Sequence, residues 1–203
     1  MENQDAYIGE IRTHLSISFI TLFVSCAIGI PTGVLSAKRE SFSNVAVNLF
    51  NSLRMIPSLA ILMAMIPLLG IGFRPALIAL SLHAIPVVII NTYAGFKSIS
   101  PVILESASGM GLSELEILTK IEFPLALPLI AAGIRTSMVD IVASATLAAY
   151  IGAGGLGVFI VSGLSFMNFT IMMTGGLSIA VIAVIIDAIL GVVQKKLIWY
   201  QNL

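Results

Sequence analysis

The chain has 203 residues, of which 58% are hydrophobic and 10% are charged, and its mean hydropathy is +1.08. Soluble domains carry about 25% charged residues, so this composition excludes an ordinary soluble protein and predicts an integral membrane protein. Ten Lys and Arg residues balance ten Asp and Glu residues, which leaves no basic surplus for binding nucleic acid.

Long apolar runs predict helical spans, because a helix crosses the bilayer with about 20 apolar residues and a barrel strand with about 10. The expected spans are residues 15–37, 45–69, 75–96, 126–151 and 170–193. Five spans make the expected fold all-α and place the two termini on opposite sides of the membrane.

The basic residues indicate the orientation, because short cytoplasmic loops are enriched in Lys and Arg. If the N-terminus lies outside, one face of the membrane carries Lys38, Arg39, Lys97, Lys120, Lys195 and Lys196, whereas the outer loops carry only Arg74. We therefore expect the C-terminus and the loop between the third and fourth spans to lie in the cytoplasm.

Polar side chains in the second and third spans are candidates for a transport pathway, because a polar group in lipid is costly unless it is paired or faces water. They are Arg54, His83 and Asn91. Arg54 is equally consistent with a side chain that extends to the cytoplasmic surface, and His83 with a hydrogen-bonded core histidine. No second ligand lies at metal-binding spacing from His83, so we expect no metal site.

The loop at about residues 98–125 is the most polar internal segment, with four Glu and one Lys between positions 105 and 124. Ser100 and Pro101 predict the start of a short helix, because Ser can accept a hydrogen bond from a free amide and Pro has no amide to leave unpaired. Gly109 and Gly111 then predict a turn that needs backbone freedom.

A second short helix is predicted after this turn. Ser113 and Glu116 form an S-x-x-E capping box, in which each side chain accepts from the other residue's backbone amide. Pro124 and Pro128 are expected to end or kink this helix as the chain returns to the membrane.

This loop resembles the EAA signature of ABC importer permeases, in which E-A-A is followed by three residues, G, nine residues and I-x-L-P. The matching positions are Glu105, Ser106, Ala107, Gly111, Ile121, Phe123 and Pro124, with Ser106 in place of Ala and Phe123 in place of Leu. The resemblance implies a coupling helix that inserts into a separate ATP-binding subunit. It assigns the coupling to Glu105, Ala107, Gly111, Ile121 and Pro124.

The alternative for this segment is an amphipathic helix lying on the bilayer surface. Such helices are usually rich in Lys and Arg, whereas anionic lipid would repel this acidic segment.

Further stretches resemble the osmoprotectant branch of these permeases, which carries glycine betaine, carnitine, choline and proline betaine. They are residues 56–62, 66–72, 132–137 and 145–157, and the span that contains Asp187. The resemblance implies a type I ABC importer permease fold, with residues 1–203 as one transmembrane domain in a bacterial plasma membrane. Some relatives carry a fused binding domain after the last helix, and this sequence ends at Leu203, so a separate binding protein is expected.

The last two spans add three charged pathway candidates, Arg135, Asp140 and Asp187. Arg135 and Asp140 lie about 140° apart around a helix, so they should find partners on neighbouring helices and not each other. An ion pair of Asp140 or Asp187 with an Arg and a role in gating are both consistent with the sequence.

Residues 151–157, IGAGGLG, contain four glycines, each of which costs a helix interior about 1 kcal/mol relative to Ala. This composition predicts a hinge or a site of close packing at the outer end of the fourth span. A re-entrant loop is equally consistent with it.

The sequence contains no G-x-x-x-x-G-K-[ST] phosphate loop, so we expect neither catalysis nor a bound cofactor in this chain. The resemblance implies ATP and Mg on a partner dimer of ATP-binding subunits, a second permease subunit, identical or different, and an extracytoplasmic substrate-binding protein, besides membrane lipid.

Two other classes of membrane protein would show different sequence patterns. A secondary transporter would show two related halves, and an intramembrane hydrolase would need a nucleophile motif such as G-x-S-x-G. Neither pattern is visible in the sequence. Within the permease class, another small amphiphile or an amino-acid-like solute is the alternative substrate.

Overall fold

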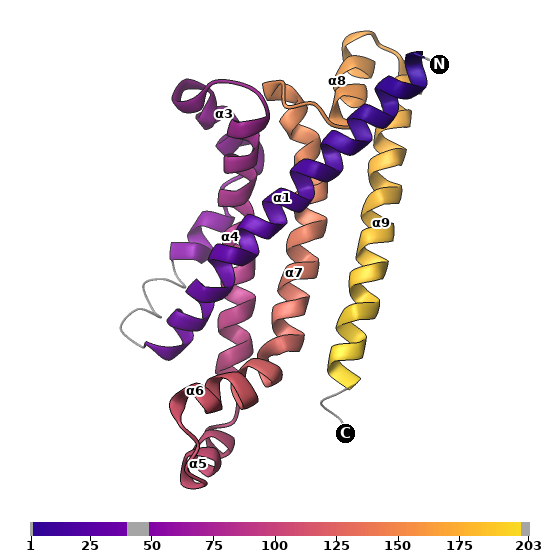
Figure 1. Cartoon of the computed structure of the whole chain (residues 1–203). Coiled ribbons are helices and arrows are strands. Elements are labelled where there is room, and N and C mark those ends of the chain that lie inside the picture. Colours follow the sequence, from indigo (N-terminus) through magenta and orange to yellow (C-terminus); the bar gives the residue numbers. More distant parts are fainter. Residues whose placement is uncertain (1, 40–48, 200–203) are drawn as a thin grey trace.

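The computed structural model describes residues 2–39 and 49–199, which form helices and turns without a strand. The predicted all-α membrane architecture is therefore confirmed. Among the described residues, four helices are long and apolar enough to cross a membrane, namely Gln4–Lys38, Phe73–Lys97, Glu114–Ile151 and Phe169–Leu197. Figure 1 shows the N-terminal end of the first helix and the C-terminal end of the last at opposite ends of the bundle.

The first helix, α1 (Glu2–Lys38), begins well before the predicted span of residues 15–37. Its polar first turns remain helical because they pack against other helices. The Tyr7 hydroxyl lies 2.5 Å from the Ser178 hydroxyl, and the Tyr7 ring meets Phe159 edge to face. At about 1.5 Å per residue, α1 is longer than a bilayer core is thick, and it runs diagonally across the other helices (Figure 1).

The second predicted span, residues 45–69, is not one helix. Residues 45–48 lie outside the described part, residues 49–54 are helical, and the helix breaks at residues 55–57 before α3 (Ser58–Leu69) begins. The break occurs before Pro57, because proline pushes the preceding residue out of the helical conformation and has no amide to donate. With 12 residues, α3 alone is shorter than a full span.

The remaining three spans lie close to their predicted positions. They correspond to α4 (Phe73–Lys97), to α7 (Phe123–Ala145) with the 3-10 turn η2 (Thr146–Ile151), and to α9 (Phe169–Trp199). Between η2 and α9 the chain forms the short helix α8 (Gly157–Ser165), which lies near the N-terminal end of α1 in Figure 1.

Helix α4 lies between α1 and α7, and glycines allow the close approach on both sides. A Cβ at Gly33 of α1 would lie 2.6 Å from the Thr92 Cβ, and a Cβ at Gly133 of α7 would lie 2.4 Å from the Asn91 Cβ. Small residues at helix interfaces are typical of membrane bundles, where packing replaces the hydrophobic driving force. This packing brings α1, α4 and α7 together just above the loop that joins α4 to α7.

Candidate functional site

The loop between α4 and α7 begins with α5 (Pro101–Gly109), which projects from the end of the bundle (Figure 1). Pro101 occupies the first turn as predicted. Ser100 has the extended backbone of a capping residue, but its side chain makes no capping hydrogen bond, so that part of the prediction is wrong. Proline alone lowers the number of amides that need a partner at this helix start.

The predicted glycine turn is confirmed at Gly111 and not at Gly109. Gly111 has a φ of +83°, where a Cβ would be strained, whereas Gly109 is the last residue of α5 and has no positive φ. The Gly111 amide donates to the Ser108 carbonyl at 2.9 Å. The required backbone freedom is therefore concentrated in one residue of the EAA-like segment.

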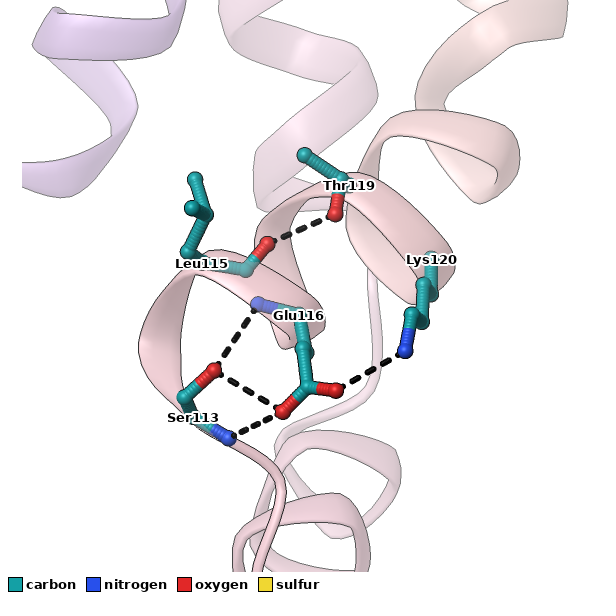
Figure 2. Close-up of polar contacts among 5 residues, drawn as sticks. All are labelled: Ser113, Leu115, Glu116, Thr119 and Lys120. Carbon is teal, nitrogen blue, oxygen red and sulfur yellow. Dashed lines mark hydrogen bonds and ion pairs between the residues drawn. The ribbon is translucent and has the colours of Figure 1, made fainter.

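The second helix, α6 (Glu114–Ile117), begins with the predicted capping box (Figure 2). The Ser113 amide donates to Glu116 Oε2 at 3.1 Å, and the Glu116 amide donates to Ser113 Oγ at 3.4 Å. The Lys120 ammonium adds a bond to Glu116 Oε1 at 2.8 Å.

The prolines at positions 124 and 128 do not end the second helix, so the prediction that they end it is wrong. A π-helical turn, η1 (Leu118–Glu122), joins α6 to α7, and the Phe123 amide donates to the Leu118 carbonyl five residues earlier. Pro124 falls in the first turn of α7 and Pro128 lies inside it. π-helical turns occur as single-turn bulges within α-helices. Membrane helices tolerate proline when neighbouring groups hydrogen-bond to the carbonyl that lacks a donor because proline has no amide hydrogen.

We call residues 101–117 the tip of the loop and η1 its base, and the tip exposes several apolar side chains. Val102, Met110 and Leu115 are 67%, 74% and 68% exposed. In contrast, Ala107 is buried. Of the other predicted coupling residues, Glu105, Gly111 and Pro124 are exposed and Ile121 is half-buried. Exposed apolar groups on a polar loop are typical of a protein contact surface, although the assigned coupling roles stay predictions.

The pathway candidates Arg135 and Asp187 form an ion pair between α7 and α9. Arg135 Nε and Nη2 each donate to one carboxylate oxygen at 2.7 Å, and Nη1 lies 3.4 Å from Gln194 Oε1. Gly191 makes room for the guanidinium, since a Cβ there would lie 3.1 Å from Arg135 Cζ. The sequence left open which Asp pairs with an Arg, and the structure selects Asp187.

Asp140 lines a cavity of about 300 Å³ together with Arg135 and Asp187. Within the described residues it makes no ion pair shorter than 4 Å. His83 of α4 is half-buried, and its Nδ1 has no hydrogen-bond partner among the described residues. The structure thus brings Arg135, Asp140 and Asp187 to one cavity.

The other pathway candidates have local explanations. Asn91 donates to the Val87 carbonyl of its own helix at 2.8 Å and packs against Gly133. Arg54 is exposed at the end of the helical segment 49–54. The described residues contain no cluster of three His, Cys, Asp or Glu side chains that could hold a metal ion.

Sequence reasoning missed two polar contacts that join distant segments. Lys38 Nζ lies 2.5 Å from Glu122 Oε2, and Glu10 Oε2 accepts from the Gly155 amide at 2.5 Å. For the Lys38–Glu122 contact, the sequence signal was Glu122, an acidic residue between apolar neighbours in the EAA-like segment. For the Glu10–Gly155 contact, the signal was Glu10, which lies on the helical continuation of the first span. Neither signal identifies the partner, because the partner lies far away in the chain.

The glycine-rich segment forms a packed turn, which we define as residues 152–156. Gly152, Gly154 and Gly155 all have positive φ. Glu10 accepts a hydrogen bond from the Gly155 amide, and His14 packs against Gly155. The prediction of close packing is therefore confirmed.

Comparison with known proteins identifies the family. Residues 29–199 match the model of the binding-protein-dependent transport system inner membrane component. The carnitine transport permease protein OpuCB of Listeria monocytogenes is 35% identical, and the match covers 97% of this chain and 90% of that protein. The glycine betaine/carnitine/choline transport system permease protein OpuCB of Bacillus subtilis strain 168 is 38% identical, with 90% and 84% covered.

A solved structure supports the fold. The MetNI methionine ABC transporter in an inward-facing conformation matches with a TM-score of 0.86 and 21% identity, over 97% of this chain and 98% of that chain. The fold is therefore that of a type I ABC importer permease. The family match and the four apolar helices make this a multi-pass membrane protein. The chain belongs to the family of binding-protein-dependent transport system inner membrane components.

Proposed function

We propose that this chain is the permease subunit of an ATP-driven importer of quaternary ammonium solutes such as glycine betaine, carnitine and choline. The observation that carries the proposal is the similarity to permeases named for these solutes, at 35–38% identity over at least 90% of this chain. Uptake of such solutes would serve osmoprotection.

The loop from α5 to η1 is the proposed site at which an ATP-binding subunit docks. Its exposed side chains Val102, Met110 and Leu115 offer apolar surface to a partner. The capping box and the Gly111 turn hold the two short helices in a defined arrangement. A preformed surface lowers the entropy cost of docking. ATP and Mg would be bound by that subunit and not by this chain.

A second permease subunit is proposed on the basis of the charges within the spans. The side chains of Arg135 and Asp187 are 36% and 40% exposed. Charged groups within a membrane-spanning helix need water or protein around them, because contact with hydrocarbon is costly. A separate extracytoplasmic binding protein would deliver the solute, as the family description implies.

The proposed location is the bacterial plasma membrane, with the N-terminus outside and the C-terminus in the cytoplasm. A cysteine at Ser108 on α5 should be labelled only from the cytoplasmic side, and one at Ser165 at the end of α8 only from outside. Both positions are exposed. Labelling of both from the same side would contradict the orientation.

The central experiment reconstitutes the permease into liposomes with the ATP-binding subunit and binding protein of the same transport system. We expect ATP-dependent uptake of labelled choline, carnitine or glycine betaine that persists when ion gradients are collapsed. Uptake driven by an ion gradient without ATP would instead identify a secondary transporter. ATP-driven uptake of an amino acid but of none of these solutes would overturn the substrate assignment.

The docking role is tested with Gly111→Asp. The φ of +83° disfavours any residue with a Cβ, and the added charge lies in an already acidic loop. We expect a permease that inserts normally but does not copurify with its ATP-binding subunit. Gly109→Ala is the matched control, since Gly109 has no positive φ and open space around it. Normal copurification of Gly111→Asp would show that this turn is not part of the docking site.

A further inference from the structure

Glu122 stands out among the charged residues because it is buried. Its exposed fraction is 4%, and every other Asp, Glu, Lys or Arg whose burial the structure describes is half-buried or exposed. It lies in η1, the π-helical turn between the docking loop and α7. A buried carboxylate is stable only with a counter-charge or hydrogen bonds.

The counter-charge comes from Lys38, the last residue of α1. Its ammonium lies 2.5 Å from Glu122 Oε2, and the Lys38 side chain is 42% exposed. Water can therefore solvate the ammonium, while the carboxylate depends on Lys38. The contact joins the end of the first span to the base of the loop, although the two residues are far apart in the chain.

Apolar contacts surround this ion pair and make the base of the loop part of the bundle. Leu118 of η1 packs in one cluster with Val34 and Ala37 of α1. The Phe96 ring at the end of α4 meets Phe123 edge to face, with ring centroids 6.4 Å apart. The base therefore contacts α1, α4 and α7, whereas the tip of the loop is exposed.

A groove separates the ion pair from the tip of the loop. It has a volume of about 720 Å³, and its lining includes Lys38, Arg39, Leu104, Leu115 and Glu122. The described residues thus leave open space between the tip and the end of α1. The Lys38–Glu122 ion pair joins the end of α1 to η1 at the edge of this groove.

We propose that the Lys38–Glu122 ion pair transmits movement of the docked loop to α1, so that both residues act as positioning residues for coupling. The inference rests on the proposed docking of an ATP-binding subunit. A subunit that pulls on the tip moves η1 with it, because α6 and η1 are one continuous helix. The ion pair then carries this displacement to the first span, which lies across the bundle (Figure 1).

The test measures solute uptake per ATP hydrolysed in liposomes that contain the complete transporter. Lys38→Met removes the counter-charge, and we expect this ratio to fall about tenfold, within the range of typical coupling between linked sites. Arg39→Met is the matched control. It removes the neighbouring positive charge from the same groove but breaks no ion pair among the described residues, and it should retain the wild-type ratio.

A double variant separates transmission from stability. Lys38→Met alone strands a buried carboxylate, which can lower the amount of folded protein. Lys38→Met with Glu122→Gln leaves no unpaired charge, so we expect normal assembly but a ratio that remains about tenfold low. The conservative Lys38→Arg should restore the ratio.

The outcomes distinguish this inference from the proposed function. If the double variant is assembled and couples like the wild type, the ion pair is only structural and the inference is wrong. If the wild-type permease itself neither binds an ATP-binding subunit nor transports with ATP, the proposed function fails first. Equal loss of coupling in Arg39→Met would also overturn the inference, since general positive charge would then be the cause.

Discussion

Two glycine turns at opposite ends of the molecule each contain a glycine with nearly the same positive φ, in different surroundings. We call residues 110–113 the open turn. Gly111 in the open turn has a φ of +83°, and a Cβ there would meet nothing within 4 Å. Gly155 in the packed turn has a φ of +85°, and a Cβ there would lie 3.2 Å from His14 Nδ1.

The comparison shows that one residue type serves two purposes. In the open turn, glycine permits a conformation that presents a surface, and no neighbouring element depends on it. In the packed turn, glycine permits a similar positive φ and also the approach of α1, whose Glu10 accepts a hydrogen bond from the Gly155 amide. Changes in the packed turn should therefore affect stability, and changes in the open turn should affect docking.

The largest effect is expected next to the packed turn, for Gly157→Ala. The new Cβ would lie 2.0 Å from the Thr146 carbonyl oxygen, and backbone atoms cannot move aside as a flexible side chain can. We expect a loss of stability at or beyond the upper end of the roughly 1–3 kcal/mol typical of overpacking. The midpoint of thermal unfolding in detergent measures it.

The matched control for this change is Gly176→Ala in α9, where a Cβ would meet nothing within 4 Å. Alanine there should leave stability unchanged or raise it by up to about 1 kcal/mol through helix propensity. Equal unfolding midpoints for the two variants would contradict the distinction between packed and open glycines.

The two carboxylates within the spans differ in a similar way, because one has an ionic partner among the described residues and the other has none. Asp187 holds Arg135 in a bidentate pair, whereas Asp140 makes no ion pair among the described residues. Asp187→Leu should therefore lower assembly and uptake more than Asp140→Leu, because it strands the guanidinium.

A double variant, Arg135→Leu with Asp187→Leu, controls for the loss of charge. Replacing both members of a pair by apolar residues is often tolerated, so assembly should recover relative to Asp187→Leu. The amount of complex recovered by affinity purification measures this. Normal assembly of Asp187→Leu alone would show that Arg135 is solvated without its partner.

A smaller effect is expected for Glu10→Leu at the packed turn. The variant leaves the buried Gly155 amide without its acceptor, which typically costs about 1–3 kcal/mol. Glu10→Gln keeps an acceptor oxygen and should recover most of the loss. If both variants unfold at the wild-type temperature, the contact between α1 and the packed turn does not contribute to stability.

The smallest effect on the fold is expected for Gly111→Ala in the open turn. The left-handed conformation costs a residue with a Cβ about 1–2 kcal/mol, but exposed loops open locally and need not lower global stability. We expect an unfolding midpoint close to that of Gly109→Ala, together with weaker copurification of the ATP-binding subunit. A midpoint as low as that of Gly157→Ala would remove the difference between the two turns.

The features that follow from neighbouring residues could be predicted from the sequence. Apolar runs located four of the five spans, and the Ser113–Glu116 spacing predicted the capping box. These features depend on hydrogen bonds and hydrophobicity over a few turns of chain, so composition and spacing are sufficient. The break before Pro57 has a local cause as well, but the apolar run concealed it.

Contacts between distant segments were decided by the tertiary structure. Sequence alone could not choose between Asp140 and Asp187 as the partner of Arg135, nor pair Lys38 with Glu122 or Glu10 with Gly155. Each choice depends on how helices pack and rotate against one another, which is set by the sum of many side-chain contacts. The sequence shows which types of group can pair, and the packing of the helices determines which of these groups come into contact.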